Sequence, residues 1–344
     1  MGYGSLCRRT FGVALALVLM GEIGHAAGEA VSTIAPTSAD WTISPPLPDA
    51  KEAVNISGAA CYQVGGERES CLLAGDEAKS GRYARFLSIE GRTIVPGPTI
   101  TLLSEKENGK KMKEADVEGV SFDEGYYYLV GSHGLSKEEA KFQASRFFVF
   151  RFKVDPETGM PSFPFDAATR PSEVEISDRL RDVIAATPEL QQCAEKPLNA
   201  HGVNIEGLAV RDGRLFLGFR APVLSGQALV MSVGIDTAFG NAPAEPQVFP
   251  IALGDGVGVR DLATVEGGFL VLSGPEMNEP GEANLFFWDG QSTAPKPLGT
   301  LGGLPDHAKP EAVLVLAEDT EAYRLLIMSD GIAGGAPMEY RVAK

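Results

Sequence analysis

A five-residue pattern that recurs along the chain constrains the fold more than any other feature. The pattern is clearest at Ile205-Glu206-Gly207-Leu208-Ala209. The five segments that we align with one another begin at Ile56, Val117, Ile205, Arg260 and Pro310, and four of them carry a carboxylate in the second place. A polar or glycine-containing turn and then a strongly apolar run follow each segment. This order of residues predicts five β-hairpins.

The spacing of these hairpins fits the blades of a β-propeller. A third apolar run closes most units, as at Phe147 to Phe152 and at Leu285 to Trp288. Units of a few short strands repeated around a centre are one way in which all-β proteins protect their edges. We therefore predict an all-β fold in which residues 56–344 form a single β-propeller domain. Five blades are visible in the sequence, and a sixth stays open.

The repeat is interrupted by an insertion at about residues 156–199. Ser172 with Glu175 three residues later has the form of a helix capping box. The apolar stripe that follows consists of Ile176, Leu180, Val183 and Ile184. These signals predict a short helix that packs on the ring as a plug or as a lid. A degenerate sixth blade within the insertion is the alternative.

The N-terminal 27 residues have the pattern of a signal peptide. Arg8 and Arg9 precede an uncharged run from Phe11 to Gly21, which is too short to span a bilayer as a stable helix. The arginine pair also resembles a twin-arginine signal, so the export route stays open. We expect a periplasmic or secreted protein with no transmembrane segment after cleavage of the signal.

Residues 28–55 form a lead-in that is rich in proline and alanine. Its strand-like patch, Trp41-Thr42-Ile43, could add an outer strand to the last repeat unit, which lacks a fourth strand. Such a strand would join the two ends of the ring. A lead-in without fixed structure is the alternative, because chain termini are often poorly ordered.

The charge balance bears on the partners. The chain has 46 acidic and 30 basic residues, a formal net charge of −16. This charge disfavours nucleic acid, because phosphate backbones need a basic face. We expect a monomer whose partner is a small anionic molecule or a periplasmic protein.

Two cysteines lie close together in the first predicted hairpin. Cys61 and Cys71 flank a glycine-containing turn and would be directly opposed across it. An oxidising compartment would favour a disulfide between them. Two buried thiols are the alternative. Cys193 has no evident mate in the sequence.

Several motifs in a fixed order resemble a bacterial family of domains of unknown function. They are Glu118-Gly119-Val120, Asn204 to Ala209, Gly258 to Leu262, and Pro310-Glu311-Ala312. The resemblance covers about residues 50–344 and implies a β-propeller-like fold without an established activity. The Glu-Gly-Leu-Ala motif is also similar to motifs of esterase-like phytases and of other calcium-bearing propeller hydrolases, such as paraoxonase and gluconolactonase. This second similarity is an analogy about function.

The repeated carboxylates define the candidate site. If the five segments are innermost strands, Glu118, Glu206, Asp261 and Glu311 lie at one height around the mouth of a central channel. Carboxylates that are close together must be protonated, paired with cations or bound to a metal. Calcium is the candidate metal, because it accepts several oxygen ligands in loose geometry. Ser57 and Asn204 could add neutral oxygens.

Three further side chains are expected near the same mouth, namely His133, Arg220 and Arg260. In one interpretation the arginines pair with the carboxylates and lock neighbouring blades together. In the other, calcium and the arginines hold a substrate while His133 moves a proton. The second interpretation predicts a hydrolase of a phosphate ester, a carboxylate ester or a lactone. A non-catalytic protein that binds a small ligand or a periplasmic partner is the alternative.

Overall fold

The computed structural model describes residues 32–344, apart from 49–51, 66–67, 76–80 and 166. All of them belong to one compact unit, Val31–Lys344. The predicted signal peptide lies outside the described residues. Within the described part, no helix is long and apolar enough to cross a membrane.

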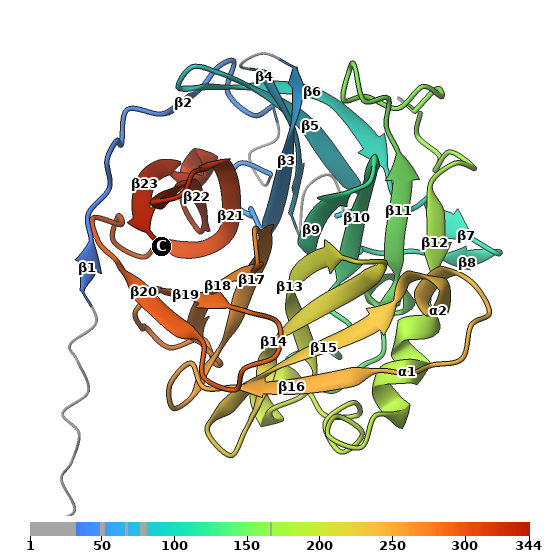
Figure 1. The fold of residues 1–344 in the computed structure, drawn as a ribbon. Helices are drawn as coiled ribbons and strands as arrows, with labels where there is room; N and C mark the ends of the chain where they lie inside the picture. Colours follow the sequence, from blue (N-terminus) through green and yellow to red (C-terminus); the bar gives the residue numbers. More distant parts are fainter. Residues whose placement is uncertain (1–31, 49–51, 66–67, 76–80, 166) are drawn as a thin grey trace, which may run out of the picture. The chain divides into compact units, whose positions relative to one another are not determined.

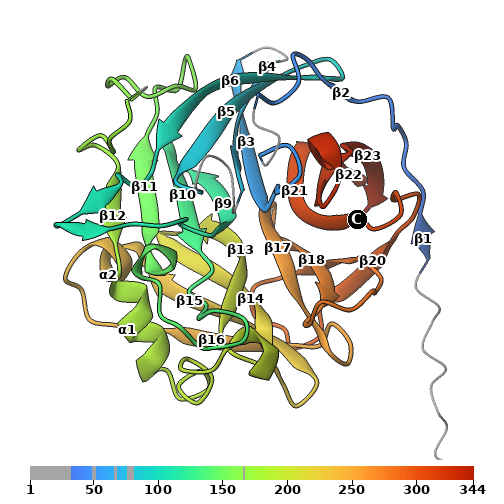
Figure 2. The same ribbon diagram turned by 180° about the vertical axis from the view of Figure 1, so that it is seen from behind.

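Five sheets stand around a common centre and form a five-bladed β-propeller (Figures 1 and 2). Blade 1 contains β3 (Gly58–Gly65), β4 (Arg68–Ala74), β5 (Tyr83–Glu90) and β6 (Thr93–Thr101). Blade 2 contains β9 (Val117–Asp123), β10 (Tyr126–Gly131), β11 (Val149–Lys153) and β12 (Glu175–Ser177). Blade 3 contains β13 (Asn204–Arg211), β14 (Arg214–Leu224), β15 (Gln227–Gly234) and β16 (Gln247–Ile251). Blade 4 contains β17 (Val257–Val265), β18 (Gly268–Pro275), β19 (Asn284–Trp288) and β20 (Lys296–Leu301). Blade 5 contains β21 (Lys309–Glu318), β22 (Ala322–Asp330) and β23 (Met338–Ala343).

The all-β prediction and the count of five blades are confirmed. The first strand of each blade is the innermost, as predicted for the repeated segments (Figure 1). Tight turns set the register of the inner hairpins. Glu124 and Gly125 between β9 and β10 have φ of 46° and 82°, and Asp212 and Gly213 between β13 and β14 have φ of 51° and 70°. Two successive residues with positive φ are typical of the type I′ turns that suit the twist of paired strands.

Apolar clusters fill the spaces between consecutive blades. Successive side chains on a strand point to opposite faces, so each blade supplies two clusters. On β10, Tyr127 packs toward blade 1 and Tyr128 toward blade 3. The cluster that contains Ile56 and Met328 joins blade 1 to blade 5 and closes the ring.

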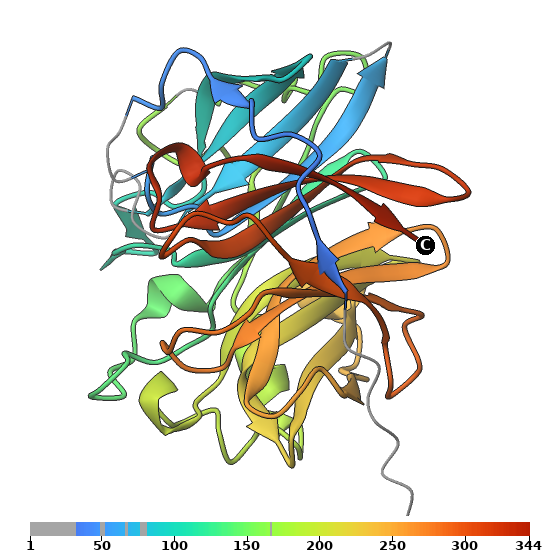
Figure 3. The ribbon, with the colours of Figure 1, turned by 90° about the vertical axis from the view of Figure 1, so that its left-hand side faces the viewer.

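The lead-in crosses the outer edges of three blades (Figures 1 and 3). Its β1 (Thr33–Ile34) pairs with β20 of blade 4, Ser38 bridges to Glu339 of blade 5, and β2 (Thr42–Ile43) pairs with β6 of blade 1. The prediction that the Trp41-Thr42-Ile43 patch extends the last unit is therefore wrong. The patch instead covers the open edge of β6, whose backbone groups need partners.

The predicted helix of the insertion is present, but it begins later than expected. It is α1 (Arg179–Ala186), and Leu180, Val183 and Ile184 are buried in the cluster between blades 2 and 3. The predicted capping box does not form, because the Ser172 hydroxyl donates to Glu173 and Ile176 belongs to strand β12. The remaining short elements are α2 (Ile235–Phe239), the 3-10 helices η2 (Ala144–Phe147), η3 (Leu198–Ala200) and η4 (Ala333–Gly335), and the hairpin β7 (Lys106–Glu107) and β8 (Lys110–Lys111).

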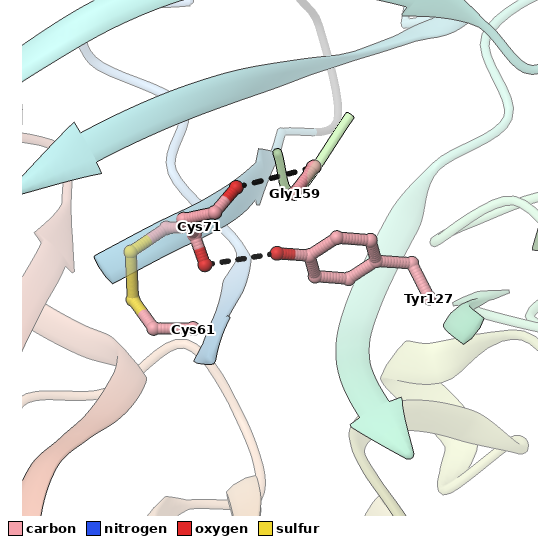
Figure 4. The surroundings of a disulfide bond; sticks show 5 residues. Cys61, Cys71, Tyr127 and Gly159 are labelled. Carbon is pink, nitrogen blue, oxygen red and sulfur yellow. Dashed lines mark hydrogen bonds between the residues drawn. A yellow bond between two sulfur atoms is a disulfide. The ribbon is translucent and has the colours of Figure 1, made fainter. Parts of the chain in front are cut away.

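Cys61 and Cys71 oppose each other on β3 and β4 and form a disulfide (Figure 4). The predicted disulfide is therefore confirmed, and the alternative of two buried thiols is wrong. Next to it, the Tyr127 hydroxyl donates to the Ser70 carbonyl at 3.0 Å, which links blade 2 to blade 1. Cys193 is a buried free cysteine.

Candidate functional site

A β-bulge occurs at the same place in four innermost strands. The residues that these bulges leave without a cross-strand partner are Glu118, Glu206, Arg260 and Glu311. A bulge turns its extra residue away from the regular alternation of the strand. These four residues, here called the central ring, therefore occupy equivalent positions in blades 2 to 5.

Asp261 was predicted at the central ring position of blade 4. This prediction is wrong by one residue, because Asp261 follows that position. Arg260 stands where blades 2, 3 and 5 have a glutamate. Asp261 accepts hydrogen bonds from the backbone N–H of Leu262 at 2.8 Å and of Val313 at 2.7 Å. Burial raises its pKa well above the usual range, although these two bonds oppose the shift. Asp261 therefore ties blade 4 to blade 5.

Close packing explains the small residue that follows most central ring positions. A Cβ atom on Gly119 would lie 2.6 Å from the Cβ of Leu208 and 2.9 Å from its backbone nitrogen. A Cβ atom on Gly207 would lie 3.0 Å from side-chain atoms of Leu262 and Val259. In each Glu-Gly pair, the glutamate therefore occupies the central ring position, and the glycine allows neighbouring innermost strands to approach closely.

The central ring borders a cavity of about 390 Å³, here called the mouth cavity. Three of its members, Glu118, Glu206 and Glu311, line this cavity, and Ser57 of blade 1 joins them. The lining includes six carboxylates and four basic side chains, but only two apolar residues, Leu135 and Leu198. A small molecule in this cavity would therefore meet mainly charged and polar groups.

Glu206 is the best-connected carboxylate of the central ring. Its Oε1 accepts from Asn204 Nδ2 and Arg220 Nη1, both at 2.9 Å, and its Oε2 accepts from Arg260 Nη1 at 2.8 Å. Burial acts to raise the pKa of Glu206, but the charges of Arg260 and Arg220 outweigh it and lower the pKa. Glu206 is therefore ionised and paired at neutral pH.

Arg220 uses its remaining donors to hold the segment after β18. Its Nε donates to the Glu276 carbonyl at 2.9 Å, and its Nη2 donates to the Met277 carbonyl at 3.0 Å and to Asn278 Oδ1 at 2.8 Å. All three guanidinium nitrogens thus have partners. Arg220 fixes the rim of the mouth cavity and has little capacity left to hold an anionic group.

Glu311 shares Arg260 with Glu206 but titrates differently. Its Oε1 accepts from Arg260 Nη1 at 2.9 Å. Burial raises the pKa of Glu311 to about 8, and the Glu206 charge adds to the rise, while Arg260 opposes it. One arginine nitrogen therefore stands between an ionised carboxylate and one that is protonated at neutral pH.

Blade 2 contributes a second group of paired charges. Arg146 lies 3.2 Å from Glu114 and 3.3 Å from Asp116, and the Ser132 hydroxyl donates to Asp116. Burial raises the pKa of Asp116, although Arg146 opposes the shift. The sequence offered no signal for Glu114 or Asp116, because both precede the repeated segment.

His133 was predicted at the mouth, and the structure places it elsewhere. It follows β10 with φ of 52° and lines a different cavity, together with residues of α1. Hydrogen bonds thus join Glu206, Arg220, Arg260 and Glu311. Asp261 lies near Glu311 but bonds to backbone groups, and His133 lines a different cavity.

The predicted calcium ligands fit the ion poorly. Both oxygens of Glu206 and both oxygens of Asp261 already accept hydrogen bonds from nitrogen donors. Across the described residues, Cys61, Glu69 and Cys71 are the one group with at least three His, Cys, Asp or Glu ligand atoms within 4.8 Å of one another, and its two sulfurs form the disulfide. Calcium at the mouth stays a prediction.

The raised pKa of Glu311 predicts a pH dependence of stability. Its folded-state pKa of about 8 lies above the ordinary 4.5, so the folded protein keeps a proton that the unfolded chain releases. This contribution is fully present below about pH 4.5 and is lost as the pH rises through about 8. We expect Glu311→Gln, which cannot ionise, to lose less stability than the wild type between about pH 5 and pH 8 in urea unfolding. Equal losses would contradict the assignment.

The fold and the site together define the class of this protein. It is a five-bladed propeller whose innermost strands border a polar cavity lined by ion pairs. The chain belongs to the family described as "Protein of unknown function (DUF3616)", whose model matches residues 71–148 and 165–334. This confirms the resemblance to a family of unknown function. A comparison with curated proteins found no match to the chain. The similarity to phytase-like hydrolases is not shown and stays an analogy.

The solved structures that match the chain do so at low sequence identity. An exo-beta-1,3-galactanase from Phanerochaete chrysosporium is 11% identical, with 91% of this chain and 64% of that chain covered and a TM-score of 0.46. The Malassezia sympodialis allergen Mala s 1 is 14% identical, with 84% and 78% covered and a TM-score of 0.40. The native Bacillus subtilis arabinanase is 14% identical, with 83% and 92% covered and a TM-score of 0.41. This chain thus spans less than two thirds of the galactanase, and similarities at this level concern the fold alone.

Proposed function

We propose that the chain binds a small, neutral, polyhydroxylated molecule, such as a sugar or a polyol, in the mouth cavity. The observation that carries this proposal is the pairing of opposite charges around a cavity of about 390 Å³. Glu206 pairs with Arg220 and Arg260, Asp116 with Arg146, and Asp330 with Lys309 at 3.0 Å.

The chemistry of the lining favours a neutral ligand over the small anion expected from the sequence. An anion would need free cations, but Arg146, Arg220 and Lys309 already pair with carboxylates. Among the basic side chains of the described lining, only Lys137 forms no ion pair, and it faces a lining with six carboxylates. A hydroxyl group both donates and accepts. Several hydroxyls on one ligand can therefore bond to carboxylates and to ammonium groups without breaking an ion pair or burying a net charge.

Ligand-dependent thermal unfolding and calorimetric titration test this proposal. We expect at least one neutral sugar or polyol to raise the melting temperature, because a ligand of the folded state stabilises it by mass action. Lys309→Met, which removes a charged donor from the cavity, should weaken this binding about tenfold. Arg341→Met is the matched control, since Arg341 also belongs to a surface ion pair but lies outside the cavity. Stabilisation by phosphate or carboxylate ions and by no neutral polyol would contradict the proposal.

Hydrolysis is the second candidate function, favoured by the opposite pKa shifts of Glu206 and Glu311. Two neighbouring carboxyl groups, one ionised and one protonated, are the pattern of an acid and base pair. Water would attack the phosphorus or the carbonyl carbon of a phosphate ester, a carboxylate ester or a lactone, and Glu206 would take a proton from that water. Glu311 would give its proton to the leaving oxygen as the ester bond breaks. His133 lies outside the mouth cavity and has no part in this version. Hydrolysis that is lost in Glu311→Gln would support this candidate, and hydrolysis that persists in the variant would count against it.

Export to the periplasm or beyond belongs to the same proposal. The disulfide between Cys61 and Cys71 supports it, because disulfides persist mainly in oxidising compartments.

A further inference from the structure

A second cavity of about 310 Å³, here called the side cavity, lies between α1 and residues 133–147. Its lining is largely apolar and includes Phe142, Phe147, Ile184 and Val203. Leu135 lines both cavities, so the side cavity adjoins the mouth cavity. The size is suitable for one aromatic ring with a short substituent.

His133 supplies the side cavity with one buried hydrogen-bond acceptor. Its Nδ1 lies 2.9 Å from the Gly131 carbonyl oxygen. A carbonyl oxygen can only accept, so Nδ1 carries the proton of the neutral ring and Nε2 has none. Burial lowers the pKa of His133 to about 4, which keeps the ring neutral at physiological pH.

The Nε2 atom of His133 is buried and makes no hydrogen bond with any described residue. A buried polar atom without a partner costs free energy, so such atoms are uncommon in folded proteins. His133 lines the side cavity but is only 2% exposed, so a ligand hydroxyl can supply the missing donor only if the side chains that cover Nε2 move aside on binding.

Arg181 supplies a positive charge at the rim. Its guanidinium lies 4.6 Å from the ring centre of Phe142 and 5.9 Å from that of Phe147. Within the described part of the chain, Arg181 forms no ion pair. Phe142 is 51% exposed, although large apolar side chains are usually covered. The rim thus presents a cation beside an uncovered aromatic ring.

We propose that the side cavity binds a small hydroxylated aromatic carboxylic acid. The aromatic ring packs against Phe142 and Phe147, the hydroxyl group donates to His133 Nε2, and the carboxylate pairs with Arg181. This site shares only Leu135 with the lining of the mouth cavity and differs from it in the chemistry of its ligand. Glu195, which is exposed at the same rim, would favour an amine instead, so the test includes one.

Calorimetric titration of the full chain with four related probes tests the proposal. They are 4-hydroxyphenylacetate, phenylacetate without the hydroxyl, 4-ethylphenol without the carboxylate, and tyramine with an amine in its place. We expect 4-hydroxyphenylacetate to bind most tightly and phenylacetate about tenfold more weakly. No binding by any probe, or tightest binding by tyramine, would overturn the proposal.

Two variants assign the contacts. His133→Asn removes Nε2, and asparagine tolerates the positive φ at this position. This variant should bind 4-hydroxyphenylacetate and phenylacetate equally. Arg181→Met should weaken both acids and leave 4-ethylphenol unchanged. Arg179→Met is the matched control on α1, because Arg179 contacts Asn241 and does not line the cavity.

The hydroxyl contact can also be tested without the His133 variant. If His133→Asn does not fold, the Nε2 nitrogen resonance of wild-type His133 should shift on binding of 4-hydroxyphenylacetate, and less on binding of phenylacetate. Equal shifts with both probes, or a preference for the hydroxyl that survives in a folded His133→Asn variant, would overturn the contact.

Discussion

Replacing Glu206 by glutamine is expected to lower the free energy of unfolding by about 3–5 kcal/mol, because it breaks a buried charge network from one side. Arg220 and Arg260 both donate to the Glu206 carboxylate, at 2.9 and 2.8 Å. Glutamine has nearly the same shape but no charge, and its NH₂ group would face an arginine donor. The positive charges of the two buried guanidinium groups would then lack the negative charge of Glu206 that balances them.

Urea unfolding at neutral pH measures this loss. Glu321→Gln is the matched control, since Glu321 is 84% exposed and lies 3.7 Å from Arg341. We expect the control to change stability by less than about 0.5 kcal/mol, because exposed ion pairs contribute little. A loss of less than about 1 kcal/mol in Glu206→Gln would mean that the network does not hold the central ring together.

Gly119→Ala is expected to destabilise the protein by about 2–3 kcal/mol, toward the upper end of the range for overpacked cores. The added Cβ would lie 2.6 Å from Leu208 Cβ and 2.9 Å from the Leu208 backbone nitrogen. Both atoms belong to β13 of the neighbouring blade, so relief requires the two innermost strands to separate. That movement would also displace Glu118 and Glu206.

The matched control for this variant is Gly234→Ala. Its added Cβ would meet its nearest neighbour, Thr237 Oγ1, at 3.6 Å, and its φ of −61° suits any residue. We expect this control to lose less than about 1 kcal/mol, since Gly234 is the N-cap of α2. If both alanine variants unfold at the same urea concentration, close packing does not explain the glycine of the repeated motif.

The repeated motif was enough to predict the fold and the innermost strands, but it left the register of blade 4 open. Aligning Arg260-Asp261 with Ile205-Glu206 gave four carboxylates at equivalent positions. In the structure Leu262-Ala263 corresponds instead to Leu208-Ala209, so Arg260 is the residue equivalent to Glu206. The apolar pair carries the register, because a shift of one residue moves every side chain to the other face of the strand. Counting carboxylates rather than apolar partners produced the error.

The rest of the site depends on backbone details that no local pattern encodes. His133, with φ of 52°, lies in the wall of the side cavity although its sequence position fits the mouth. The lead-in also contacts blades 4 and 5, which are far from it in sequence, through β1 and Ser38. By contrast, the ion-pair interpretation of Arg220 and Arg260 agrees with their contacts to Glu206, because buried charges of opposite sign must pair.

Thermal unfolding in excess calcium and in a chelator tests most directly whether arginines, rather than a metal, hold the carboxylates of the mouth. The arginine contacts of Glu206 predict the same melting temperature in both conditions for the wild type, and a lower but equally calcium-independent one for Glu206→Gln. A rise with calcium in the wild type that disappears in Glu206→Gln would show binding to the folded state through this carboxylate. That result would contradict the account and restore the calcium site predicted from the sequence.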